Sequence, residues 1–120
     1  MHTVCELRTF RRQAAEAGMT DEEVDALVTF IAHNPTAGDE MAGTGGCRKV
    51  RIAGRGKGKS GGYRTVTFYT GNNIPVFLVA VFSKGERANL TQAERNQLAV
   101  MTRAIVEHYR TKVVKVSNER

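Results

Sequence analysis

Hydrophobic residues in the first third of the chain recur at the spacing of short amphipathic helices. Residues 4–17 indicate an edge strand that runs into a helix, which Gly18 ends. Thr20 and Glu23 form a capping box for a second helix, because each side chain can bond the other residue's backbone amide. Asn34-Pro35 ends this helix, so the pattern predicts an αα-hairpin. The apolar stripe of the second helix comprises Val24, Leu27, Val28 and Ile31.

The middle of the chain shows the alternation of β-strands. Residues 48–53 form a first strand, with Lys49 and Arg51 on one face and apolar residues on the other. A glycine-rich hairpin loop at 54–62 leads to a second strand at 63–70. In that strand one face carries Arg64, Val66 and Phe68, and the other carries Tyr63, Thr65, Thr67 and Tyr69. A turn then precedes an almost wholly apolar stretch at Ile74–Phe82, which predicts a strand covered on both faces.

The C-terminal part predicts one more helix over residues 91–110. Thr91 and Glu94 form a second capping box at its start. Its buried stripe comprises Leu98, Met101, Ile105 and Tyr109. Residues 111–120 are either a frayed extension of this helix or a short strand.

This order of elements predicts an α+β fold. We expect an antiparallel sheet of 3–4 strands, with a leading αα-hairpin, a C-terminal helix, and helices covering one face. The length of 120 residues fits one domain over 1–120. Its parts are the N-terminal strand and helix pair (1–46), a three-stranded sheet (47–82) and the C-terminal helix (91–110).

Basic residues without any acid fill the centre of the chain. Residues 41–85 hold eight Lys and Arg and no Asp or Glu, whereas the rest holds ten basic and twelve acidic residues. The overall charge of +6 therefore arises in this segment. Like charges repel, so a segment that excludes carboxylates is arranged to meet an anion such as a phosphate backbone. The alternative is a flexible basic loop without a ligand.

Several common sites are not predicted. Gly56–Gly61 matches G-x-G-x-x-G, and Gly58-Lys59-Ser60 resembles the end of a P-loop, but both patterns must open a helix and here a strand follows. The three histidines are scattered and the acids form no cluster, so we expect no metal and no cofactor. Cys5 and Cys47 are isolated thiols, which favours a reducing compartment. No signal peptide or membrane span is indicated, and we expect a bacterial cytoplasmic protein.

If this chain cleaves nucleic acid, it must use lysine, arginine and tyrosine side chains, and RNA permits this because it carries its own nucleophile, the 2′-hydroxyl. The protein must align this group, remove its proton, stabilise the crowded phosphorane and protonate the leaving 5′-oxygen. Arginines bind phosphate bidentately, a lysine crowded by other cations can act as a base, and an aromatic ring can stack a base. The residues alone leave open whether the cations catalyse or only bind phosphate.

Three linked segments resemble the RelE/HigB-like toxins of type II toxin–antitoxin systems, in particular the branch with a GK-x-GGYR hairpin and a K-x-ERAN loop. They are Cys47–Arg51, Gly58–Thr65 and Phe82–Thr91, and the likeness covers nearly the whole chain. The resemblance implies a RelE-like microbial-ribonuclease fold. It also implies an mRNA interferase that inhibits translation by cleaving mRNA in the ribosomal A site without a metal. The alternative is a non-catalytic nucleic-acid-binding protein or a ParE-like gyrase-directed toxin.

The resemblance also implies site residues and partners. By position, the expected catalytic residues are Lys49, Arg51, Arg64 and Lys84. The expected contacts to RNA or the ribosome are Arg48, Arg55, Lys57, Lys59, Tyr63 and Arg87. Asn89 and Leu90 stand where some relatives have a tyrosine, which leaves Tyr63, Tyr69 and Phe82 as candidates for stacking a base. Expected partners are a cognate antitoxin, with a helix-turn-helix type among the options, mRNA on the ribosome, and ribosomal RNA. Operator DNA is expected only through the antitoxin.

Overall fold

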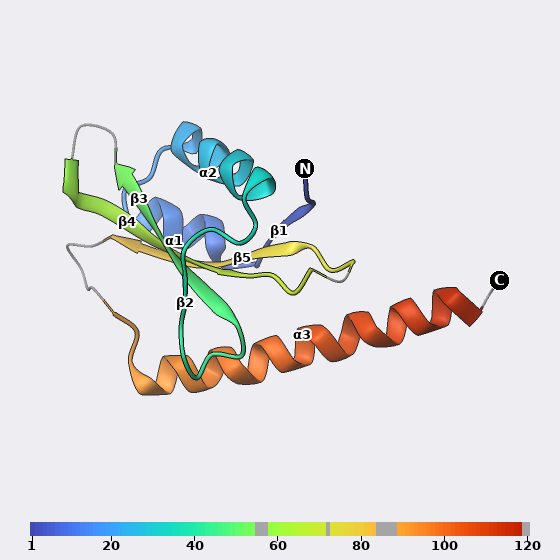
Figure 1. Cartoon of the computed structure of the whole chain (residues 1–120). Helices are drawn as coiled ribbons and strands as arrows, with labels where there is room; N and C mark the ends of the chain where they lie inside the picture. Colours follow the sequence, from blue (N-terminus) through green and yellow to red (C-terminus); the bar gives the residue numbers. More distant parts are fainter. Residues whose placement is uncertain (55–57, 72, 84–88, 119–120) are drawn as a thin grey trace.

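The described residues form three helices and five strands (Figure 1). The computed structural model describes residues 1–54, 58–71, 73–83 and 89–118, with the backbone alone for 54, 58–61 and 111–118. The elements, in order, are β1 (Val4–Glu6), α1 (Phe10–Glu16), α2 (Asp21–His33), β2 (Asp39–Glu40), β3 (Cys47–Gly54), β4 (Gly58–Phe68), β5 (Val76–Ser83) and α3 (Gln92–Asn118). This mixture of helices and strands is the predicted α+β class.

A single five-stranded sheet forms the centre of the molecule, in the order β1-β5-β4-β3-β2. The hairpins β3–β4 and β4–β5 are antiparallel, as their short connections require. β1 lies parallel to β5, with Val4 opposite Val76, because helices α1 and α2 and three strands separate the two along the chain. The sheet is therefore mixed, which corrects the expectation of a purely antiparallel one of 3–4 strands.

One face of the sheet packs against α1 and α2. Phe10 of α1 and Leu27 and Ile31 of α2 are buried in a cluster with Val50 of β3 and Leu78 of β5. The apolar stripe predicted for α2 therefore meets the apolar side of the strands. Burial of such side chains contributes roughly 1.5–3 kcal/mol each to folding.

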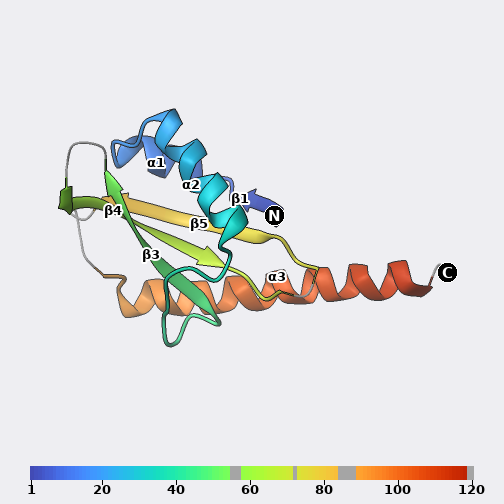
Figure 2. The ribbon, with the colours of Figure 1, turned by 45° about the horizontal axis from the view of Figure 1, so that its top comes forward.

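The opposite face packs against α3, so the helices cover both faces and not one (Figure 2). Val66 and Phe68 of β4 and Phe77 of β5 form this second cluster, against which the predicted stripe of α3 packs. Its partly buried members from α3 are Leu98, Met101, Ile105, Val106 and Tyr109. β5 is thus buried from both sides, as its apolar sequence predicted.

The predicted helix caps are confirmed. The Thr20 hydroxyl accepts from the Glu23 amide at 3.1 Å, and the Glu23 carboxylate accepts from the Thr20 amide at 2.9 Å. Thr91 and Glu94 repeat the arrangement at 3.1 and 2.8 Å. Gly18 ends α1 at a φ of 92°, which favours glycine. The caps therefore set where α2 and α3 begin.

Other boundaries differ from the predictions. The predicted hairpin loop at 54–62 is shorter, because β3 continues to Gly54 and β4 begins at Gly58, with these two glycines paired. β2 was not predicted, since it is two polar residues long. α3 extends to Asn118, eight residues beyond the expected end at 110, which resolves the open choice for residues 111–118 in favour of helix. A helix satisfies its own backbone hydrogen bonds and can leave the sheet, whereas a lone strand cannot. Within the described residues, no helix is long and apolar enough to cross a membrane.

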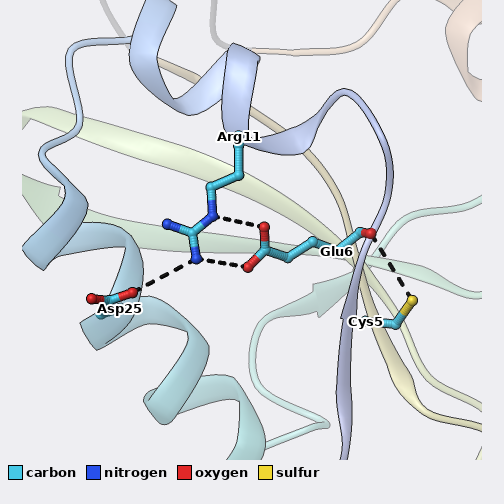
Figure 3. A network of polar contacts seen from close by, with 4 residues as sticks. All are labelled: Cys5, Glu6, Arg11 and Asp25. Atoms are coloured by element: carbon cyan, nitrogen blue, oxygen red, sulfur yellow. Dashed lines mark hydrogen bonds and ion pairs between the residues drawn. The ribbon is translucent and has the colours of Figure 1, made fainter.

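An arginine with three acidic contacts joins α1 to its neighbours (Figure 3). The Arg11 guanidinium donates from Nε and Nη2 to the two Glu6 carboxylate oxygens, both at 2.8 Å, and Nη2 lies 3.6 Å from Asp25. The hydrogen bond to Glu6 raises the pKa of Arg11 above its ordinary value. Arg11 thus shows how this chain neutralises a structural arginine.

Candidate functional site

Two adjacent strands bring three basic side chains onto one face of the sheet. Arg51 of β3 lies directly opposite Arg64 of β4, and Lys49 lies two residues before Arg51, opposite Val66. Residues two apart in a strand share a face, and directly opposed residues have Cβ atoms about 5 Å apart. Like charges placed this close are destabilising, so the arrangement calls for an anion to offset it. This set, Lys49, Arg51 and Arg64, is called the cationic triad below.

Arg64 is the most deeply placed member of the triad. Its side chain is only 5% exposed, and it lies opposite Phe82 of β5 on its other side. Among the described residues, Arg64 has neither a hydrogen bond nor an ion pair to a side chain. Arg11, by contrast, forms ion pairs with the carboxylates of Glu6 and Asp25. A buried cation is costly unless it is paired, so Arg64 is suited to an anion from outside the described part of the chain.

A hollow lies beside this arginine. It measures about 340 Å³, and its described lining is Arg51, Ile52, Ala53 and Arg64. Ligand pockets in proteins span roughly 300–1,000 Å³, so a nucleotide-sized group is within range. The cationic residues of the described lining are both arginines, and a guanidinium group presents a fork of donors that matches phosphate oxygens.

Lys49 is held by a residue that sequence reasoning did not assign to the site. Its Nζ donates to Oδ1 of Asn89 at 3.1 Å, across 40 positions of the chain. An amide oxygen orients the ammonium without cancelling its charge, whereas a carboxylate would form an ion pair. Asn89 was noted only for replacing a tyrosine; its position between the last strand and the final helix was the available signal.

Arg48 is not brought to the triad. It alternates with Lys49 along β3, and its Nη1 donates to the Gly38 carbonyl at 3.2 Å. Its Nη2 also lies 3.8 Å from a carboxylate oxygen of Glu40 in β2. These contacts tie Arg48 to the loop before β3, so the structure gives no support to its expected role in binding RNA.

Tyr63 is a core residue, which does not fit its expected role in RNA binding. It is 1% exposed in the cluster beneath α1 and α2, and its hydroxyl donates to the Gly18 carbonyl at 3.2 Å. Burial raises the pKa of this phenol, with a smaller contribution from Glu23. A ring enclosed in this way cannot stack an RNA base.

The other two aromatic candidates differ in position. Phe82 lies opposite Arg64, on the face of the sheet that carries the triad. There it is buried in the cluster that packs against α3. Tyr69 lies on the opposite face, where its ring meets His2 edge-on with centroids 5.2 Å apart. Of the three aromatic candidates, only Phe82 lies on the face of the sheet that carries the triad.

The remaining predicted residues fall at the margins of the described chain. Lys59 lies in β4 by its backbone, and its side chain is not described. Outside the described residues are Arg55, Lys57, Lys84 and Arg87. Among the residues that are described, no three His, Cys, Asp or Glu side chains gather as metal ligands would.

The sequence was also compared with models of protein families. Residues 2–120 match the model described as RelE toxin of the RelE/RelB toxin–antitoxin system. The match spans all five strands and all three helices. It therefore includes every member of the cationic triad and Asn89.

Proposed function

The chain belongs to the RelE toxin family and is thus the toxin of a toxin–antitoxin system, and from this premise we propose that it is a ribosome-dependent endoribonuclease. Its substrate would be mRNA undergoing translation, and its effect would be to stop protein synthesis in the cytoplasm. A RelE toxin also has a cognate antitoxin that holds it in check. The branch with the GK-x-GGYR hairpin remains our proposal within this family.

One observation carries the proposal: a buried arginine, unpaired within the described residues, lines a hollow together with a second arginine from the neighbouring strand. In our proposal a scissile phosphodiester occupies this hollow. Arg64 binds its non-bridging oxygens, and Arg51 binds the same phosphate from the neighbouring strand. Charge on these oxygens grows in the phosphorane, so donors fixed beforehand stabilise the transition state more than the substrate.

The proposed reaction uses the 2′-hydroxyl of the RNA as nucleophile. Its oxygen attacks the adjacent phosphorus, the bond to the 5′-oxygen breaks, and the first product ends in a 2′,3′-cyclic phosphate. One group must take the 2′-proton and another must give a proton to the 5′-oxygen. Lys49, and Lys84 directly after β5, are the proposed candidates for these two transfers.

The charge of the site favours catalysis without a metal ion. Cations line the hollow, and they would repel a divalent cation, whereas carboxylates are the usual ligands for Mg²⁺. Binding to the ribosome is proposed for Arg55, Lys57 and Lys59, which in the sequence lie between the end of β3 and the first residues of β4. Such contacts to phosphate weaken as salt rises.

The first test is cleavage of a translated message by the wild type and by Arg64→Ala. Loss of a preorganised donor to the developing charge is expected to lower the cleavage rate about 100-fold or more. Primer extension on an mRNA, with and without ribosomes, measures both the cleavage and its dependence on translation.

The matched control is Arg12→Ala, which removes an exposed arginine of α1 whose contact is with Glu16 at 4.0 Å. It should cleave at the wild-type rate. Equal cleavage by folded Arg64→Ala and Arg12→Ala would refute the proposed role of the triad. Tight RNA binding without any cleavage by the wild type would favour a non-catalytic RNA-binding toxin instead.

A further inference from the structure

We propose that the antitoxin binds this toxin by adding an extended segment to the outer edge of β3, beneath α2. The segment would alternate acidic and apolar residues. This inference rests on membership of the RelE family, which provides an antitoxin, and not on the proposed ribonuclease activity.

The outer edge of β3 is only partly covered by the chain itself. β2 pairs with Arg48 and Lys49 and goes no further along β3. The Cys47 carbonyl accepts from the Met41 amide at 2.8 Å. The backbone N–H and C=O of Cys47 therefore point away from β4, toward the outer side of β3. These groups alternate along a strand, which directs those of Arg51 outward as well. No described residue pairs with them there, so Arg51 offers a donor and an acceptor to an added strand.

An apolar groove runs beside this edge, between α2 and β3. It measures about 320 Å³, and α2 contributes Ala26, Leu27 and Phe30 to it while β3 contributes Ile52. Phe30 is 44% exposed. Among the described residues the other large exposed apolar side chains are Met1 and Val100, which do not line this groove. An unpartnered aromatic next to an uncovered strand edge indicates a peptide that supplies both backbone bonds and apolar side chains.

The two faces of β3 determine the chemistry of the bound segment. Ile52 points toward the α2 side and Arg51 toward the triad side. An added strand places alternate side chains on these same two faces. Apolar residues would enter the groove under Phe30, and acidic ones would meet Arg51. RNA fits this groove poorly, because most of its described lining residues are apolar and only one of them, Arg51, is basic.

Binding at this edge would reach the hollow beside Arg64, and this consequence, unlike the docking itself, rests on the proposed function. Arg51 lines both the groove beneath α2 and the hollow that it shares with Arg64. A carboxylate that engages Arg51 from the edge removes one of the two guanidinium groups from the phosphate site. Docking on β3 would therefore inhibit the toxin without the antitoxin having to fill the hollow.

The test measures the affinity of full-length toxin for its purified antitoxin. Phe30→Glu and Ala26→Glu each place a charge in the apolar groove, and each is expected to weaken binding about tenfold or more. Ala26 is exposed on α2, so Ala26→Glu is expected to fold. It keeps the test valid if Phe30→Glu unfolds the protein. Amide hydrogen exchange on the wild-type complex should also show protection of residues 47–54.

Val100→Glu is the matched control, since it places the same charge at a 63% exposed apolar position on α3. Its affinity should equal that of the wild type. Unchanged affinity of folded Phe30→Glu and Ala26→Glu, or equal weakening by all three variants, would overturn the proposal. So would a loss of self-association or of RNA binding with antitoxin affinity intact, because the groove would then serve a second copy or RNA. Cleavage is not measured here, so failure of the ribonuclease proposal would leave this result standing.

Discussion

At the scale of single residues, the site is distinguished by cations that have no carboxylate partner among the described residues. Arg11 and Arg48 each lie near a carboxylate, as structural arginines usually do. Arg64 has no such neighbour among the described residues, and Lys49 is oriented by the neutral amide of Asn89. Among the described residues, no carboxylate therefore pairs with Arg64 or Lys49.

The amide at position 89 gives a prediction of its own. Asn89→Asp puts a negative charge 3.1 Å from the Lys49 ammonium, which would bind that ammonium and repel a phosphate. Cleavage of a ribosome-bound message is expected to slow about tenfold. Asn89→Ala, which only frees the lysine, is expected to slow it about threefold. Single-turnover rates for both variants check this, and equal rates would show that the neutrality of Asn89 is immaterial.

At the scale of elements, the packing of a loop on α3 completes the second core. Thr102 of α3 donates to the Thr44 carbonyl at 3.2 Å, and Arg95 donates to the Ala42 carbonyl at 2.9 Å. Gly45 has a φ of 80°, and a Cβ there would collide with the Thr102 hydroxyl. The loop before β3 therefore approaches α3 as closely as glycine permits.

A pair of glycine variants separates contact from backbone conformation. Gly43 has a φ of 76° like Gly45, but nothing lies within 4 Å of an added Cβ. Gly43→Ala is expected to lower the free energy of unfolding by about 1 kcal/mol, because only the positive φ is unfavourable for alanine. Gly45→Ala adds a collision with Thr102 and should lower the free energy of unfolding by about 2–4 kcal/mol. Urea denaturation of both variants measures the difference. Equal losses of unfolding free energy would show that Thr102 of α3 moves aside for the added Cβ.

Sequence patterns predicted the features that depend only on neighbouring residues in the chain. The capping boxes at Thr20 and Thr91 fixed two helix starts, and alternation placed Lys49 and Arg51 on one face. Which face α3 covers was not predictable, since both faces of a strand such as β5 are apolar. The burial of Tyr63 was missed for a related reason: a tyrosine beside Arg64 fits a core or a binding site equally well, and the register of β3 decides between them.

At the scale of the whole molecule, we expect folding stability to depend on the titration of a buried thiol. Cys47 is enclosed in the core beneath α3, and this burial raises its pKa from about 9 to about 11. Above pH 9 the unfolded chain loses this proton while the folded chain retains it. The free energy of unfolding therefore falls as pH rises from about 9 to about 11, by about 2–3 kcal/mol in total.

Cys47→Ala removes this titration and should lessen the alkaline loss, although the variant starts less stable at neutral pH. Unfolding by urea at pH 8 and pH 10.5 gives the two differences to compare. Cys5→Ala, at the partly exposed cysteine of β1, is the control and should follow the wild type. Identical alkaline losses for all three proteins would mean that the Cys47 thiol is not protected in the native state.

The position of α3 after every strand in the chain has a consequence during translation (Figure 1). While a nascent chain still has this helix in the exit tunnel, the sheet can already meet α1 and α2. Its second face, with Phe68, Phe77 and the side of the sheet that carries Arg64, has no cover at that moment. The face of the sheet that carries Arg64 therefore acquires its cover only after α3 has emerged, later than the face that packs against α1 and α2.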